Sequence, residues 1–277
     1  MNTKKFFIYG MLLLASFLLV VSTRCKKEDD KPTPPVENGG NGEDFTCGDD
    51  FTDSRDSTVY STVQIGGQCW MAENLKYLPE VHGSVESWGS YTVYDYIDSA
   101  NDVETAKATE NYNIYGVLYN WPAAMDGAES SEENPSGVQG VCPTDWHLPS
   151  DAEWLQLKNY LISNNYNYDG TNEDNKIAKS LAATSYWETS TTEGAIGNDM
   201  SENNSSGFNA LPGGARFGDF VEINKSGYWW SATDASTSNG YPYLYKLSNF
   251  SYQLKRFDVL FWGPHYQSGF SVRCIKD

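Results

Sequence analysis

Residues 142–161, CPTDWHLPSDAEWLQLKNYL, contain the clearest element boundary in the chain. Pro149 ends an extended segment, and Ser150 suits a helix N-cap because its hydroxyl can accept a hydrogen bond from an unpaired backbone N–H of the first turn. Glu153 follows three residues later and can bond back to the N–H of Ser150, which completes a capping box. The sequence therefore predicts that a helix begins directly after Ser150.

The apolar residues behind this cap recur at helical spacing. Trp154, Leu157 and Leu161 form a stripe that Leu155 and Ile162 widen. This pattern predicts an amphipathic helix of about three turns, and we expect the fold to be built against its apolar face.

Three residues of the same stretch belong to types that perform acid–base chemistry, namely His147, Asp151 and Glu153. Carboxylates in the first turn are already explained by capping and by the positive end of the helix dipole. A histidine beside a tryptophan at the start of a helix is more often structural. No phosphate loop or nucleophile elbow occurs elsewhere, so the sequence predicts no catalytic residue.

The first 24 residues have the pattern of a signal peptide. Lys4 and Lys5 precede a nearly unbroken apolar run over residues 6–21, which is short for a spanning helix. Cys25 follows at once, as the lipid acceptor of a bacterial lipoprotein does, although Arg24 stands where a small residue is usual. The alternatives are an ordinary signal peptide cleaved elsewhere and an uncleaved anchor. Residues 25–44 are a charged, Pro- and Gly-rich tether.

The chain is acidic, with 37 Asp and Glu against 19 Lys and Arg and a formal net charge of −18. Such a balance argues against nucleic acid and against an anionic membrane surface as partners, because both carry negative charge. It favours solubility outside the cell. The membrane contact that we expect is the N-terminal lipid anchor alone.

Apart from Cys25, four cysteines are present, and an even count in an exported protein suggests two disulfides. Three connectivities are possible. We favour a local bridge between Cys47 and Cys69 and a long-range bridge between Cys142 and Cys274. No Cys-x-x-Cys pair occurs and the three histidines are scattered, so no zinc site is predicted.

The remaining pattern is that of an α+β fold. Residues 58–65 have the alternating pattern of a strand, with Val59, Ser61, Val63 and Ile65 on one face. Gly66-Gly67 suits a two-residue hairpin turn, and residues 68–75 are predicted to form the second strand of the hairpin, with its Trp and Met in the core. Residues 79–110 are interpreted as a loop with one strand near 90–96, and residues 113–125 as a buried turn or short helix interrupted by Pro122. A second helix is expected over 175–184. Short strands follow near 215–221, 227–232, 241–248, 251–257 and 268–275, without βαβ alternation.

Six separated blocks resemble, in order, the Fibrobacter succinogenes major paralogous domain: residues 59–75, 115–121, 142–154, 207–214, 228–233 and 269–274. The resemblance covers residues 45–277. It implies an exported, often lipid-anchored bacterial domain. The charged stretch after Cys25 also resembles the start of surface lipoproteins of the Bacteroidetes, which implies an outer-membrane, surface-exposed location.

Residues 146–154, WHLPSDAEW, also resemble the helix start of the formylglycine-generating, sulfatase-modifying group, which implies a C-type-lectin-like fold with two short helices, twisted antiparallel strands and long loops. That group uses a pair of cysteines late in the chain. Here only Cys274 stands there, so the activity is not carried over and a non-enzymatic protein is expected.

Aromatic residues crowd the last part of the chain, and exposed rings suit sugar faces or a protein partner. Trp229 and Trp230 are adjacent, so on a strand they point to opposite faces; one can lie in the core while the other is exposed or covered by a loop. With Tyr243, Trp262 and Arg216 they are the candidate ligand residues. The alternatives are that these rings fill the core and that Arg216 forms a structural salt bridge.

Calcium is not predicted, because residues 169–175 have only a loose likeness to a calcium loop. The function expected from the sequence is a lipid-anchored binding or adhesion module for a glycan or a cell-surface protein. The alternatives are a structural surface protein without a small ligand and, less favoured, a degenerate relative of the sulfatase-modifying enzymes.

Overall fold

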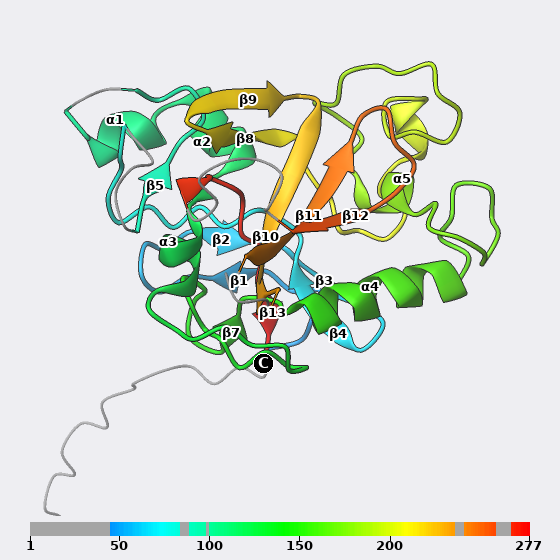
Figure 1. The fold of residues 1–277 in the computed structure, drawn as a ribbon, viewed down its shortest axis with the longest axis horizontal. Helices are drawn as coiled ribbons and strands as arrows, with labels where there is room; N and C mark the ends of the chain where they lie inside the picture. The colour runs from blue at the N-terminus through cyan, green and yellow to red at the C-terminus, as the bar shows by residue number, and fades with distance from the viewer. Residues whose placement is uncertain (1–44, 84–88, 98–99, 236–240, 259–266) are drawn as a thin grey trace, which may run out of the picture. The chain divides into compact units, whose positions relative to one another are not determined.

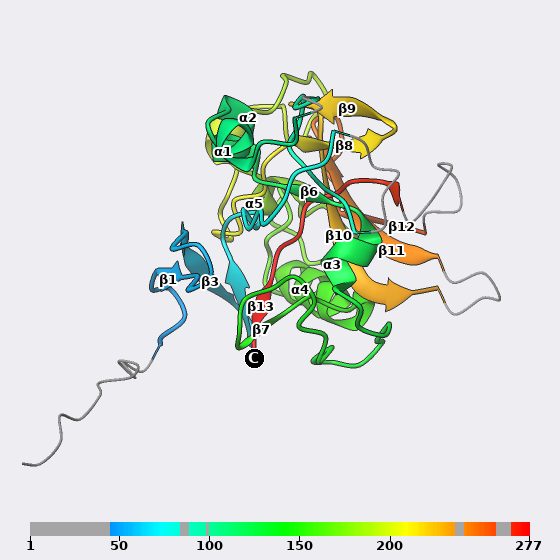
Figure 2. The same ribbon diagram turned by 90° about the vertical axis from the view of Figure 1, so that its left-hand side faces the viewer.

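The long strand pair of β10 (Ser226–Asp234) and β11 (Pro242–Ser248) is the central feature of the fold (Figures 1 and 2). It belongs to a five-stranded sheet in the order β12-β11-β10-β8-β9, in which β8 (Gly213–Phe217), β9 (Asp219–Ile223) and β12 (Lys255–Asp258) complete the set. All pairings are antiparallel except that of β8 with β10. The computed structural model describes residues 45–83, 89–97, 100–235, 241–258 and 267–277.

A four-stranded sheet brings the two ends of the domain together. It has the order β3-β4-β13-β7, with β3 (Thr62–Ile65), β4 (Gln68–Met71), β7 (Trp146–His147) and β13 (Ile275–Lys276). Ile275 of the last strand pairs with Trp70 on one side and with His147 on the other. Two-stranded sheets are formed by β1 (Phe51–Thr52) with β2 (Val59–Tyr60), and by β5 (Tyr91–Thr92) with β6 (Leu118–Tyr119).

The helices are short. They are α1 (Val103–Lys107), α2 (Glu110–Tyr115), α3 (Trp121–Met125), α4 (Asp151–Ser163), α5 (Ala178–Leu181) and the 3₁₀ turn η1 (Met200–Glu202). α4 confirms the predicted helix: Ser150 accepts from the N–H of Glu153, whose carboxylate accepts from the N–H of Ser150. Its buried side chains include Trp154, Leu157 and Leu161, and the helix contacts β3 and β10. None of the helices in the described ranges is long and apolar enough to span a bilayer.

Several local predictions were wrong at their boundaries. Pro122 does not interrupt a helix but lies in the first turn of α3, where a missing N–H costs nothing, and Asn120 caps that helix. The strand predicted at 215–221 is two strands, which reverse at Gly218 in the left-handed region, with φ of 90°. α5 is shorter than the predicted second helix, and α1 was missed within the predicted loop over 79–110.

The predicted alternation over residues 58–65 also fails. The hairpin of β3 and β4 is present, but Val59 is 51% exposed while its neighbour Tyr60 is fully buried. Ser61 separates β2 from β3, and the two strands pair in different sheets. Burial alternates from Val59 to Thr62, with Val59 and Ser61 exposed, but Ile65 is buried, so the four residues predicted on one face do not share it.

The buried apolar side chains form two clusters on either side of the same strands. Trp70, Trp154 and Trp229 belong to one cluster, and Met71 and Trp230 belong to the other. In the first cluster, Trp154 stacks on Tyr245 with ring centroids 4.7 Å apart. Adjacent residues on one strand point to opposite faces, so β4 and β10 are each buried on both sides.

Both favoured disulfides are present. Cys47 bonds to Cys69 beside the hairpin, and Cys142, which precedes α4, bonds to Cys274, which precedes β13. Cys142 and Cys274 are both fully buried within the second cluster. The long-range bridge therefore joins the start of α4 to the last strand across 132 residues of sequence.

Removing the long-range bridge should destabilise the protein more than removing the local one. Loop-closure entropy assigns about 5 kcal/mol to a bridge that spans 132 residues and about 3 kcal/mol to one that spans 22. Urea unfolding of C142A/C274A and C47A/C69A, each compared with the unmodified protein, measures the two losses. A larger loss for C47A/C69A would contradict this ranking.

Candidate functional site

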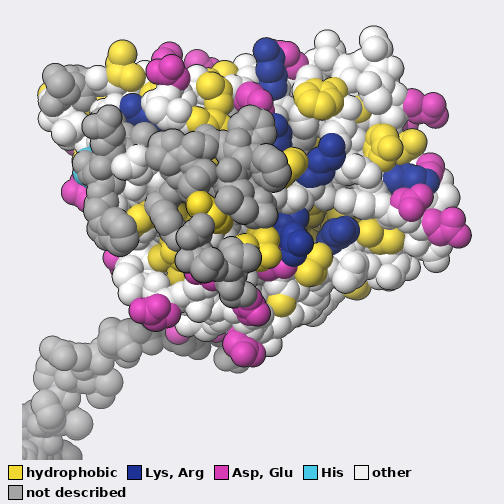
Figure 3. All heavy atoms as spheres, viewed as in Figure 1, with side chains coloured by type: hydrophobic (Ala, Val, Ile, Leu, Met, Phe, Trp, Pro, Cys, Tyr) yellow, Lys and Arg dark blue, Asp and Glu magenta, His cyan; other side chains and the backbone are white. Residues whose placement is uncertain are grey.

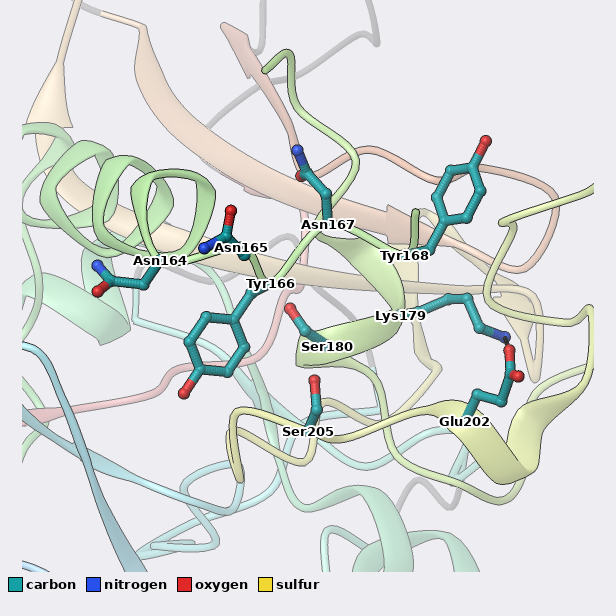
Figure 4. A pocket seen from close by; sticks show the side chains of 9 residues that line it. All are labelled: Asn164, Asn165, Tyr166, Asn167, Tyr168, Lys179, Ser180, Glu202 and Ser205. Carbon is teal, nitrogen blue, oxygen red and sulfur yellow. Dashed lines mark ion pairs between the residues drawn. The ribbon is translucent and has the colours of Figure 1, made fainter. Parts of the chain in front are cut away.

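A polar cleft of about 450 Å³ lies beyond the carboxyl end of α4 (Figure 4). Its wall is the segment that follows α4, and its remaining residues come from α5 and from the chain around η1. The lining residues are Asn164, Asn165, Tyr166, Asn167, Tyr168, Lys179, Ser180, Glu202 and Ser205. In the view of Figure 4, Ser180 and Ser205 lie between Tyr166 and the Lys179–Glu202 ion pair. The cleft has the size of a small-molecule site, while its lining is more polar than usual.

The wall is shaped by asparagines that end the helix. Asn164 donates its amide to the carbonyl of Tyr160 at 2.8 Å, and Asn165 takes a left-handed φ of 62°, which asparagine tolerates better than most residues. Asn167 is buried: its side-chain oxygen accepts from the N–H of Lys176 at 2.9 Å and its amide donates to the carbonyl of Glu173 at 2.8 Å. The wall is therefore tied to the loop that leads to α5.

Lys179 of α5 fixes the opposite side. Its ammonium donates to the carbonyl of Asp199 at 2.8 Å and also to the carbonyl of Asn198, and it lies 4.0 Å from the carboxylate of Glu202. Burial lowers the pKa of Lys179, against the opposing effect of Glu202 and Asp199. These bonds hold η1 against α5. Each side of the cleft is therefore fixed by a buried side chain that makes more than one hydrogen bond, Asn167 on one side and Lys179 on the other.

Other polar groups of the cleft are free to bind a ligand. Within the described part of the chain, the side-chain polar groups of Asn165, Tyr166, Tyr168 and Ser205 make no hydrogen bond to the protein. The carboxylate of Glu202 is largely exposed. Together they present an amide, three hydroxyls, a carboxylate and two aromatic rings. Such a set suits a ligand that carries hydroxyl groups and has an apolar face.

The structure places both candidate tryptophans in the core, which is one of the alternatives that the sequence leaves open. Trp229 and Trp230 are both 0% exposed. The indole N–H of Trp229 donates to the side-chain oxygen of Asn74 at 2.9 Å, and that of Trp230 donates to the carbonyl of Tyr119 at 2.7 Å. The two rings point to opposite faces of β10, as alternation predicts, and an apolar cluster covers each face, so neither ring can bind a ligand.

The other candidate ligand residues do not meet in the cleft. Arg216 is 6% exposed; its guanidinium donates to the carbonyls of Gly218 and Gly83 and lies over Phe220, 4.5 Å from the ring centre. No carboxylate in the described ranges forms an ion pair with it. Tyr243 is half-buried on β11, under the guanidinium of Arg256. Trp262 and Cys25 lie outside the described residues.

His147 has a structural environment, as expected. One ring nitrogen lies 2.7 Å from the carboxylate of Glu153 and the other lies 2.5 Å from that of Asp277. The other carboxylate oxygen of Glu153 accepts from the N–H groups of Ser150 and Ser136 at 2.9 and 3.1 Å. Burial lowers the pKa of His147, but the hydrogen bonds and charges of Glu153 and Asp277 outweigh it, so the pKa is raised. Asp151 accepts from the hydroxyl of Tyr245 and pairs with Arg256.

The sequence did not predict the cleft residues, because the segments that contain them have the composition of surface loops. The run Asn-Asn-Tyr-Asn-Tyr over residues 164–168 directly follows the predicted helix, and this concentration of amides and rings was the available signal. Within the described residues, no group of three or more His, Cys, Asp or Glu side chains is arranged to hold a metal ion.

Comparison with known proteins identifies one family. The family model described as the Fibrobacter succinogenes major domain matches residues 63–276. It spans the six blocks that resemble this family, apart from the first few residues of the first block. No curated protein and no solved structure matches the chain.

The stabilisation that His147 provides should depend on pH. Its pKa is raised above the value of 6.5 expected in the unfolded chain, so the stabilisation is complete below about pH 6.5 and is lost as the pH rises through the folded-state pKa. Relative to the unmodified protein, H147Q should lose about 2 kcal/mol of unfolding free energy at pH 5.5, as for charged hydrogen bonds, and less at pH 9. Urea unfolding across this range measures the difference.

The control is the same substitution in an E153Q background, where it should cost less at pH 5.5 because one charge partner is gone. A loss from H147Q that stays constant between pH 5.5 and pH 9 would contradict the prediction.

Proposed function

This chain belongs to the Fibrobacter succinogenes major domain family, and we propose that it is an exported, surface-held binding module that recognises a glycan in its polar cleft. The observation that carries the proposal is a set of cleft side chains to which no group in the described ranges is hydrogen-bonded. Asn165, Tyr166, Tyr168 and Ser205 offer donors, acceptors and ring faces at a site whose walls are held by buried bonds. A preformed site of this kind loses little entropy on binding.

The cleft favours a sugar over a flat protein partner. Protein interfaces of standard size bury about 800 Å² per partner and centre on desolvated anchor residues. Here the free groups surround a hollow of about 450 Å³ and are mainly amides and hydroxyls. Sugar hydroxyls pair with such groups, and the face of a sugar ring packs on tyrosine.

We also propose that the domain has a C-type-lectin-like fold without enzymatic activity. The short helices, antiparallel sheets and paired ends of the chain are compatible with that fold, and superposition of a crystal structure on C-type lectins checks it. The acidic groups near α4 are already bonded within the protein: Glu153 to His147 and to the N–H of Ser150, and Asp151 to Tyr245 and Arg256. We therefore expect no turnover of glycosides or peptides, and measurable turnover would contradict this part of the proposal.

Two disulfides suggest an oxidising compartment outside the cytoplasm. We propose that Cys25 carries a lipid that anchors the domain to the outer membrane, with residues 25–44 as the tether. This part of the proposal comes from the apolar run and the cysteine that follows it.

Substitutions in the cleft should weaken binding to a glycan identified on an array. Y166A removes a ring face and should lower affinity about tenfold, while N165A removes amide hydrogen bonds and should lower it about fivefold. Isothermal titration with the array-selected glycan measures both effects, and circular dichroism checks folding.

Matched controls are available outside the cleft. Tyr186 is 49% exposed beside Tyr115, and Asn159 is exposed on α4. Y186A and N159A should keep full affinity. If no glycan binds, or if the cleft and control variants bind equally, the proposed site is wrong. Binding of a cell-surface protein alone would favour the adhesion alternative.

Cys25 should be the site of lipid attachment. In a bacterial host that processes lipoproteins, the full chain should incorporate labelled palmitate and fractionate with the outer membrane. C25A should incorporate none and should appear as a soluble or unprocessed form. An unlabelled full chain in a host that labels its own lipoproteins would show that Arg24 prevents processing.

A further inference from the structure

A second, smaller hollow lies at the turn between β11 and β12. It has a volume of about 170 Å³ and is lined by residues of both strands and of the turn, among them Phe250, Gln253, Lys255 and Phe257. Phe250 is 62% exposed, an unusual position for a large apolar ring. Figure 3 shows Lys and Arg side chains interleaved with hydrophobic ones over β11 and β12.

Two lysines line this hollow, and the ammonium of one of them is free to pair with an anion. Lys246 is half-buried; it pairs with Glu222 at 2.9 Å and lies 4.6 Å from the ring centre of Tyr228. Lys255 is exposed, and no carboxylate in the described ranges forms an ion pair with it. The side-chain amide of Gln253 likewise makes no hydrogen bond to the described protein. In a chain of net charge −18, a free ammonium beside an exposed ring and a free amide is a local exception.

The turn that carries this hollow also contacts the polar cleft. Tyr252 lies between Phe250 and Gln253 in the sequence, and its ring centre is 6.0 Å from that of Tyr168, which lines the cleft. Tyr252 and Tyr168 therefore form an aromatic contact between the turn that carries the second hollow and the polar cleft.

The turn is held in place by three hydrogen bonds from two other segments. Asn175 donates its amide to the carbonyl of Leu254 at 2.7 Å, and the N–H of Ala178 donates to the carbonyl of Tyr252 at 3.1 Å. The N–H of Ile196 donates to the carbonyl of Ser251 at 3.3 Å. Because Ala178 begins α5, which also carries Lys179 and Ser180 of the cleft, the two hollows share one support.

We propose that this second hollow is a subsite for an anionic sugar unit, and that the ligand is a linear anionic glycan whose neighbouring units occupy the polar cleft. Lys255 neutralises the carboxylate or sulfate, Gln253 bonds to a ring hydroxyl and Phe250 packs against the sugar face. The inference rests on the proposed function, since it extends the ligand of the same binding surface. It also accounts for the position of a basic, aromatic hollow on an acidic protein.

The test compares hexagalacturonate with its methyl ester, which has the same sugar chain but carries uncharged ester groups in place of the carboxylates. At low salt, hexagalacturonate should bind about tenfold more tightly than the ester. K255Q should remove most of that difference and reduce the salt dependence of binding, without changing affinity for the ester. K107Q, which removes a lysine on α1 away from both hollows, is the matched control and should leave both affinities unchanged.

Further variants separate this proposal from the cleft itself. F250A should weaken both hexamers, and Y166A should weaken both as well, because the cleft holds the neighbouring units. A chondroitin sulfate hexasaccharide that binds more tightly than hexagalacturonate and responds to K255Q would identify sulfate as the anionic group.

Equal binding of the acid and the ester would overturn the anionic subsite, and so would an affinity for the acid that K255Q does not change. The proposed function would still stand in either case if Y166A weakens binding of a glycan. Failure of hexagalacturonate, its ester and the sulfated hexasaccharide alike would also overturn it. If in addition no array glycan responds to Y166A, the proposed function fails too.

Discussion

The burial of β10 on both faces is the constraint on which the rest of the domain depends. Trp229 and Trp230 are consecutive, so they point to opposite sides of the strand, and each side must be covered by apolar residues. α4 and Tyr245 cover one side, and Phe270 covers the other. A strand used in this way cannot offer a binding face. The proposed recognition of a glycan is therefore left to the loops and turns that surround the two clusters.

The sequence predicts the features that depend on neighbouring residues. The start of α4 follows from Ser150 and Glu153 because a capping box is closed within one turn. The hairpin of β3 and β4 follows from its Gly-Gly turn. The burial of Trp229 could not be predicted from neighbouring residues, because it depends on Asn74 and on strands that lie far away in the sequence. Strand alternation tells which rings face opposite sides, but not whether both sides are covered.

The cleft could not be predicted for a related reason. Its residues come from three segments, around Asn165, Lys179 and Ser205, and each segment on its own reads as a polar loop or short helix. What turns them into a site is a set of bonds between the segments, such as that from Lys179 to the carbonyl of Asp199. The amide-rich run after α4 marked one wall, but nothing local indicated what would face it.

Buried charged residues in the six blocks that mark the family make internal contacts. Arg273 is fully buried, its pKa is lowered to about 9 by burial, and it donates to Asn74 and lies over Phe208. Glu153 is likewise taken up by the cap of α4 and by His147. These residues all belong to the six blocks that mark the family, and their roles are internal. The lining of the cleft lies between the blocks, so the residues that carry the resemblance to the family are not the residues of the proposed site.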